Sequence, residues 1–204
     1  MKKNKEIEEY LDYLYPNPKC ELNYNKDYEL LIATVLSAQT TDKRVNEVTS
    51  ILFNKYNTLE ALANANVNDI ANIIKPIGMV NKKSVFVKDI SIYLLNNCNG
   101  MVPNDRDILS NINGVGRKTI NVVLSNLYDY PAIAVDTHVS RVSKRLGIAK
   151  RDDDVLTIEN KLMKYFDKSK WSRLHHQMVL FGRYKCKSIS PLCDDCRFKS
   201  FCKK

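Results

Sequence analysis

Apolar residues recur with the period of an α-helix along almost the whole chain, and no segment shows the sustained alternation of a half-buried strand. Tyr28–Gln39 is apolar nearly all round, which predicts a buried central helix. Pro131–Val135 is the one strand-like run, and it is too short to build a sheet. The pattern therefore predicts an all-α protein. The expected helices are Glu6–Leu14, Tyr28–Gln39, Asp42–Tyr56, Leu59–Ala65, Asp69–Lys75, Lys82–Asn97, Asp105–Asn111, Arg117–Tyr128, Thr137–Leu146, Val155–Phe166 and Trp171–Tyr184.

The composition excludes several classes of protein. Of the 204 residues, 44% are hydrophobic and 27% are charged, which is ordinary for a folded domain and excludes a disordered chain. The longest charge-free apolar stretch, around Leu30–Ala38, is far shorter than the ~20 residues of a membrane span. The first residues mix Lys with Glu and contain no apolar signal core, so we expect a cytoplasmic protein.

The charge balance points to a partner. There are 32 Lys and Arg residues against 23 Asp and Glu, a net charge of +9. A surplus of this size favours a polyanionic partner, of which nucleic acid is the commonest. A basic but inert surface is the alternative.

Four of the six cysteines stand together near the C-terminus, in the pattern C-x6-C-x2-C-x5-C formed by Cys186, Cys193, Cys196 and Cys202. Cytosolic thiols stay reduced, so a metal is favoured over two disulfides. Structural zinc usually takes two close Cys pairs, whereas the wider spacings here suit a cluster of four irons with separated corners. Spacing alone favours iron–sulfur over zinc modestly. Cys20 and Cys98 are interpreted as small buried hydrophobes.

A short turn between two expected helices carries a second signal. It contains Gly114 and Gly116, followed at once by Arg117 and Lys118. Two glycines let the backbone turn sharply and present N–H groups, and the positive end of the next helix points the same way. This favours a grip on a DNA backbone. A plain helix–helix turn with chance basic residues is the alternative.

The residues of this turn and three other segments resemble those of a known family. Gly114–Thr119 with the following Asn121–Leu124 resembles the helix-hairpin-helix of the endonuclease III family of base-excision DNA glycosylases. Leu36–Asp42, Ala134–His138 and the four-cysteine tail also match that family, in the family's order. Two positions depart from its pattern: Asn113 stands where Pro is common, and Met79 stands where Leu is common.

The resemblance implies an architecture of two α-helical domains with a DNA-binding cleft between them. A six-helix barrel would comprise residues 22–132 and include the helix-hairpin-helix at about 105–127. Residues 1–21 and 133–204 would form the second domain, with one [4Fe-4S] cluster held by the four clustered cysteines in a C-terminal loop. The hairpin and Asp136 would meet at the cleft.

The resemblance also implies two catalytic residues. The Lys118 amine would attack the sugar C1′ and form a Schiff base, and the Asp136 carboxylate would stabilise the positive charge on the deoxyribose. The first helical turn and partial burial would both favour a neutral amine at Lys118. A phosphate-binding surface lysine and a helix N-cap are the alternative roles, and the N-cap role is compatible with the catalytic one.

Further positions follow from the same match. Gln39 would fill the gap left by a flipped base, and Met79 would wedge into the opposite strand. The alternatives are an ordinary loop glutamine and a core methionine. Lys185 and Lys187, beside the first cysteine, would contact DNA together with Gly114, Gly116 and Arg117. A structural, hydrogen-bonded role is favoured for His138.

The function implied is a bifunctional DNA glycosylase and abasic-site lyase acting on oxidised pyrimidines in double-stranded DNA. We expect a monomer, associated with the nucleoid through DNA and not with membranes. The rivals are a mismatch adenine glycosylase, which lacks the lyase lysine, and a non-catalytic DNA-binding module stapled by a metal. The presence of Lys118 and the end of the chain just after Cys202 favour the first interpretation.

Overall fold

The computed structural model describes residues 3–204, and within that range it contains helices and turns but no β-strand, which confirms the all-α prediction. The chain divides into two compact units. Glu21–Leu127 forms one, here called the hairpin unit. The other, here called the cysteine unit, combines the described part of Met1–Cys20 with Tyr128–Lys204. In the described range, none of the helices is both long and apolar enough to cross a membrane.

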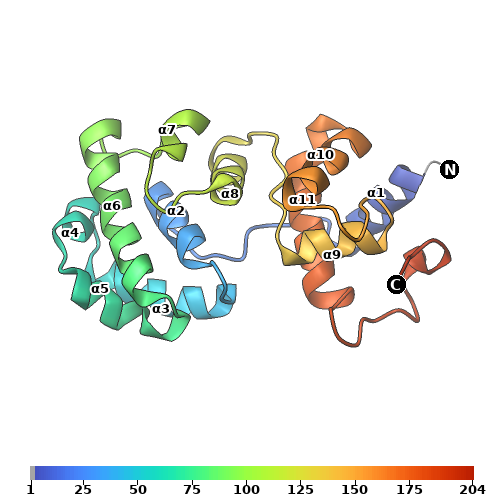
Figure 1. The fold of residues 1–204 in the computed structure, drawn as a ribbon, viewed down its shortest axis with the longest axis horizontal. Coiled ribbons are helices and arrows are strands. Elements are labelled where there is room, and N and C mark those ends of the chain that lie inside the picture. The colour runs from blue at the N-terminus through green and yellow to red at the C-terminus, as the bar shows by residue number, and fades with distance from the viewer. Residues whose placement is uncertain (1–2) are drawn as a thin grey trace. The chain divides into compact units, whose positions relative to one another are not determined.

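The hairpin unit is built around two helices, α2 and α6. Helix α2 is buried along nearly its whole length, as predicted, and α6 packs against α2, α4 and α5 (Figure 1). The elements of this unit are α2 (Asp27–Leu36), α3 (Asp42–Lys55), α4 (Leu59–Asn64), α5 (Val67–Ile74), η1 (Lys75–Ile77), α6 (Val80–Cys98), α7 (Arg106–Ser110) and α8 (Arg117–Tyr128).

Helix α2 ends earlier than the apolar pattern predicts. It stops at Leu36, because the chain turns over Ser37–Thr40 and Gln39 takes a left-handed backbone with φ +57°. The Ser37 hydroxyl donates to the Thr34 carbonyl at 2.8 Å and so closes the last turn. This early stop exposes the Gln39 side chain at a loop instead of placing it in a helix.

The cysteine unit packs around a core drawn from both ends of the chain. Ile7 and Leu11 meet Ile158, Met178 and Phe181, all fully or almost fully buried. Its elements are α1 (Lys3–Leu14), α9 (Thr137–Arg145), α10 (Val155–Tyr165), η2 (Lys168–Lys170), α11 (Trp171–Leu180), the π-helical segment η3 (Phe181–Lys185) and η4 (Arg197–Ser200). The sequence predicts one helix over Trp171–Tyr184, whereas the last turn is π-helical.

The run Pro131–Val135 has no strand partner and is an extended connection. Ile133 and Val135 insert into the core of the cysteine unit. The division between the units therefore falls at Leu127 and Tyr128, whereas the expected boundary lies at residue 132.

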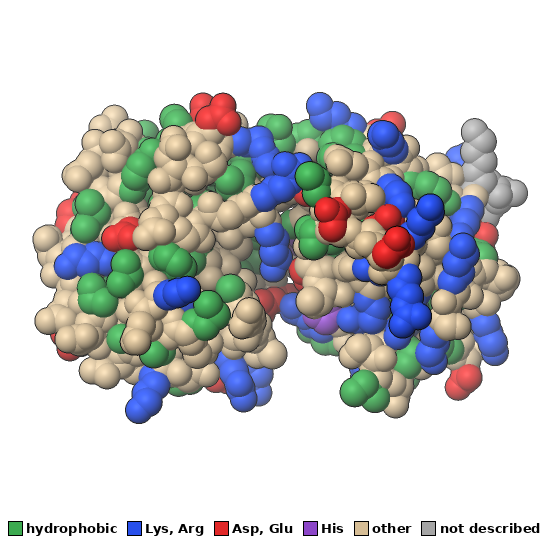
Figure 2. Space-filling view, in the orientation of Figure 1, with side chains coloured by type: hydrophobic (Ala, Val, Ile, Leu, Met, Phe, Trp, Pro, Cys, Tyr) green, Lys and Arg blue, Asp and Glu red, His purple; other side chains and the backbone are tan. Residues whose placement is uncertain are grey.

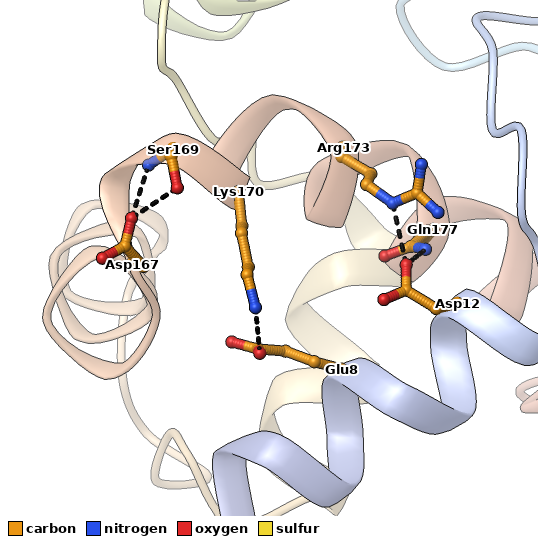
Figure 3. A network of polar contacts seen from close by, with 7 residues as sticks. All are labelled: Glu8, Asp12, Asp167, Ser169, Lys170, Arg173 and Gln177. Carbon is orange, nitrogen blue, oxygen red and sulfur yellow. Dashed lines mark hydrogen bonds and ion pairs between the residues drawn. The ribbon is translucent and has the colours of Figure 1, made fainter.

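Polar contacts fasten α1 to the C-terminal helices (Figure 3). Lys170 Nζ lies 2.5 Å from Glu8 Oε2. Asp12 Oδ1 accepts from Arg173 Nε and Gln177 Nε2, each at 2.8 Å. Because the partners are more than 160 residues apart in sequence, these contacts fix the N-terminal helix within the cysteine unit.

Candidate functional site

The hairpin joins α7 to α8 through a tight turn. The Val115 amide donates to the Ile112 carbonyl at 3.0 Å, and the Ile120 amide donates to the Gly116 carbonyl at 3.0 Å. The Arg106 guanidinium donates to Asn121 Oδ1 at 2.8 Å and ties the two helices together. The sequence therefore forms a helix-hairpin-helix.

The two hairpin glycines differ in the space that surrounds them. Gly114 has φ +84°, and a Cβ built on it would lie 2.5 Å from Phe86 Cγ on α6. Gly116 has an ordinary backbone, and a Cβ there would meet nothing within 4 Å. Gly114 is thus required by the protein's own packing, whereas Gly116 leaves open space beside its backbone, as close approach to a phosphate needs.

Asn113, where the family commonly has Pro, holds the hairpin in another way. Its side-chain amide donates to Asp89 Oδ2 on α6 at 2.6 Å. A hydrogen bond between elements replaces the conformational restriction that a proline ring would supply.

Arg117 and Lys118 begin α8, and both side chains are exposed. The expected partial burial of Lys118 is not seen, since its side chain projects into solvent. An exposed amine on the first turn of a helix is accessible to a bulky substrate such as DNA.

Asp136 lies in the cysteine unit as the N-cap of α9. Its Oδ1 accepts from the Val139 amide at 2.8 Å, so the capping role is confirmed. His138 is half-buried and its Nδ1 lies 3.2 Å from Arg141 Nη2, which agrees with a structural role. The cap leaves Asp136 fixed and partly exposed.

The two predicted base-flipping residues both lie on exposed turns of the hairpin unit. Gln39 follows α2, and Met79 precedes α6 with its side chain 47% exposed. Both have left-handed backbones, with φ +57° and +50°. The exposure of Met79 argues against its alternative role in core packing.

The four clustered cysteines line one cavity of about 260 Å³ within the cysteine unit. No disulfide joins them, and in residues 3–204 no group of three or more Cys, His, Asp or Glu side chains could hold a single metal ion. Four basic side chains share the lining: Arg145, Lys185, Lys199 and Lys204. The four thiols and four basic side chains therefore line one cavity. Cys20 and Cys98, outside this set, are half-buried.

Arg145 on α9 holds the first cysteine segment. Its Nη1 donates to Cys186 Sγ at 3.3 Å and to the Lys187 carbonyl at 2.7 Å. Arg141, one helical turn earlier, donates to the Cys186 and Gly182 carbonyls at 3.1 and 2.7 Å. Neither arginine was picked out by the sequence, because basic residues on a helix normally face solvent.

The two lysines beside Cys186 differ. Lys187 is exposed, as a DNA contact requires. Lys185 is 9% exposed and its Nζ donates to Asp195 Oδ1 at 2.8 Å. Burial is the largest single influence and lowers the pKa of Lys185, but the hydrogen bonds and charges of Asp195 and Tyr10 together outweigh it and hold the pKa above its ordinary value. Lys185 therefore braces the cysteine segment, and Lys187 is the one of the two lysines whose side chain is exposed for a DNA contact.

The basic charge is divided unequally. Glu21–Leu127 carries 11 basic and 10 acidic residues, which leaves 21 basic and 13 acidic residues for the cysteine unit. On the face drawn in Figure 2, Lys and Arg side chains gather over the cysteine unit and are sparse over the hairpin unit. The net charge of +9 is thus almost entirely a property of the cysteine unit.

Residues 32–168 match the model of the HhH-GPD superfamily of base excision DNA repair proteins. The chain is 45% identical to endonuclease III of Bacillus subtilis over 98% of its own length and 92% of that protein. It is 41% identical to endonuclease III of Escherichia coli K12, over 92% and 88% of the two chains.

Two solved structures of endonuclease III with DNA are similar to this chain in both fold and sequence. A non-covalent endonuclease III–DNA complex is similar with a TM-score of 0.94 and 44% identity, over 100% of this chain and 96% of that one. A trapped covalent endonuclease III–DNA intermediate is similar with a TM-score of 0.93 and 44% identity, over 100% and 97%. By sequence, hairpin and fold, the chain belongs to the endonuclease III family within the HhH-GPD superfamily.

Proposed function

We propose that the protein is a bifunctional DNA glycosylase and abasic-site lyase that removes oxidised pyrimidines from double-stranded DNA. The observation that carries the proposal is an exposed lysine, Lys118, on the first turn of the helix that follows the Gly114–Gly116 hairpin. Relatives that share 41–45% identity are endonucleases III, and one structural relative was trapped covalently on DNA. A covalent adduct requires a nucleophile, and the resemblance of the Gly114–Thr119 motif to that of the family supports Lys118 in this role.

The chemistry assigns one step to each of two side chains. As the C1′–N bond breaks, positive charge develops on the deoxyribose, and the fixed Asp136 carboxylate stabilises it. The neutral Lys118 amine bonds to C1′ and the base leaves with the bonding electrons and a proton. The C1′–O4′ bond then breaks, O4′ takes the bonding electrons and a proton, and the Schiff base is left at C1′. At a preformed abasic site, the amine instead adds to the aldehyde, which loses water to give the same Schiff base. The Schiff base acidifies the 2′ proton, and its removal expels the 3′ phosphate by β-elimination.

The hairpin and the two exposed turns serve binding. Gly114, Gly116 and Arg117 would receive the phosphate backbone, with Gly116 leaving room for close approach. Gln39 would fill the space of the flipped base and Met79 would enter the opposite strand. Lys187, in the more basic unit, would add a phosphate contact.

We infer one [4Fe-4S] cluster at Cys186, Cys193, Cys196 and Cys202. The residues fit such a cluster, because four thiols and four basic side chains line one cavity of about 260 Å³ and Arg145 donates a hydrogen bond to Cys186 Sγ. When bound, the cluster serves as a structural clamp for the basic loop between the first two cysteines. Protein purified anaerobically should contain four iron and four sulfide per chain, and stoichiometric zinc without iron would contradict the assignment.

Borohydride trapping on abasic duplex DNA tests the function. Wild-type protein should yield a covalent adduct, and Lys118→Gln should abolish both the adduct and strand cleavage while damaged DNA still binds. Arg117→Gln is the matched control, because it removes the neighbouring charge but not the nucleophile, and it should still form the adduct. An adduct at wild-type yield from Lys118→Gln would assign the nucleophile to another amine, and a wild-type protein without any adduct would favour the binding-module or adenine-glycosylase alternative.

A further inference from the structure

Lys83 is the largest fully buried side chain among residues 3–204, with 1% of its surface exposed. It lies in the first turns of α6, where the positive end of the helix disfavours a cation. Within residues 3–204 no carboxylate pairs with it, and burial lowers its pKa. A buried cation in such a position is costly, so its contacts must provide the compensation.

Those contacts join two turns that are distant in sequence. Lys83 Nζ donates to the Ala38 carbonyl at 2.8 Å and to the Ile77 carbonyl at 3.1 Å. Ala38 immediately precedes Gln39, and Ile77 lies two residues before Met79. One ammonium group therefore holds the backbones of both exposed turns.

Both turns contain backbone conformations that cost energy. Gln39 and Met79 have left-handed backbones, which non-glycine residues adopt only at a cost in energy. Gly78, with φ +69° and ψ 174°, occupies a region open essentially to glycine alone. Such turns keep their conformation only where neighbouring groups determine it, and Lys83 is a neighbour common to both.

We propose that Lys83 is a positioning residue that sets the separation of the Gln39 and Met79 turns and thereby the extrusion of the damaged base. The inference rests on the proposed function. In this proposal the buried Lys83 side chain couples Gln39, which fills the gap left by the base, to Met79, which enters the opposite strand. Lys83 touches neither DNA nor the reacting atoms, so it acts through the two turns.

The test compares two substrates that differ in the free energy needed to extrude the damaged base. Lys83→Met keeps the volume and removes the donors. Single-turnover base release is measured on one lesion placed opposite a normal base and opposite an abasic residue, because extrusion costs least where pairing is already lost. We expect a loss of about 10²-fold on the paired lesion, the size that small misplacements of positioning groups produce, and only a few-fold loss on the unpaired one. Equal losses on both substrates would show a merely structural role and overturn the proposal.

Amide hydrogen exchange gives a readout independent of activity. In Lys83→Met, exchange should rise together over residues 37–42 and 76–82 and stay unchanged in the hairpin at 111–116. No rise at either turn would overturn the proposal. Lys82→Met, an exposed neighbour on the same helix, controls for loss of a charge and should resemble wild type in both experiments.

A second variant keeps the proposal testable if Lys83→Met does not fold. Lys83→Arg keeps a cation and several donors but changes the reach of the group, so the same dependence on substrate is expected at smaller size. Its absence would overturn the proposal. Failure of the proposed function is recognised separately, because wild-type protein would then form no borohydride adduct while the exchange result on the two turns stands.

Discussion

The backbone of Gly114 lies against the aromatic ring of Phe86, so closely that a Cβ on the glycine would lie 2.5 Å from Cγ of the ring. This contact seats the hairpin on α6, and it separates two glycines that look equivalent in the sequence. A side chain at Gly114 would disturb the fold, whereas the open space beside Gly116 is available for the ligand.

Alanine at each position should therefore give opposite results. Gly114→Ala combines a clash with an unfavourable positive φ and should destabilise the protein by more than about 1 kcal/mol. Gly116→Ala should unfold like wild type but bind DNA more weakly, because its methyl group enters the space left for a phosphate. Thermal unfolding and binding to undamaged duplex measure the two effects. A Gly116→Ala protein with normal DNA affinity would contradict the phosphate contact.

Asp136→Asn separates catalysis from capping. Asn is about as good an N-cap as Asp, so the melting temperature should change little. Base release should fall roughly 10²–10³-fold, as for the loss of one group that stabilises a charged transition state. The borohydride adduct on a preformed abasic site should survive, because Lys118 is untouched. If stability falls as far as in Asp136→Ala, the cap explains the residue and the catalytic assignment loses its support.

The two lysines beside Cys186 should differ in salt dependence. Lys187→Ala should flatten the plot of log affinity against log salt by about 0.9 if one phosphate contact is lost. Lys185→Ala should leave the slope unchanged and lower the melting temperature, because its ammonium is committed to Asp195. A flattened slope in Lys185→Ala would show that this lysine leaves Asp195 to bind DNA.

Lowering the pH should weaken the contacts that Asp12 makes between α1 and the rest of the cysteine unit. Burial raises the pKa of Asp12, but hydrogen bonds from Gln177 and Arg173 outweigh it and hold the pKa below its ordinary value. Because the folded pKa is depressed, the contribution is complete above the unfolded pKa of ~3.9 and is lost as the pH falls through the folded pKa. Asp12 is largely exposed, so we expect less than about 1 kcal/mol.

Unfolding by denaturant at pH 7 and at pH 3 measures this contribution. The difference between wild type and Asp12→Asn should be present at pH 7 and shrink at pH 3. Glu9→Gln, a change to an exposed acid on the same helix, is the control and should match wild type at both values. A difference that stays constant with pH would assign the effect to packing and not to the charge.

Local signals predicted much of the helical framework. Arg117–Tyr128 has the bounds expected from its sequence, and Asp136 caps α9 as its residue type suggests. Helix ends are read well where a capping side chain or a glycine stands at the boundary, because those interactions are local.

Other features depend on contacts between distant residues. Lys83 lies among polar neighbours and looks like a surface lysine; only the carbonyls of Ala38 and Ile77 explain its burial. The π-helical turn at Phe181–Lys185 aligns Gly182 with Arg141, and no residue within the turn signals it. The cysteine spacing predicted a metal site, but the arginines that support Cys186 come from another helix.

The origin of the cysteine unit in both ends of the chain has a consequence for synthesis on the ribosome. The hairpin unit is contiguous, so every partner it needs is available once Leu127 has emerged. Helix α1 precedes the hairpin unit in the chain, yet its partners Lys170 and Asp195 are translated 162 and 185 residues after the α1 residues that they contact. The nascent chain therefore carries an undocked amphipathic helix, with Ile7 and Leu11 uncovered, until the helices that cover them have been translated.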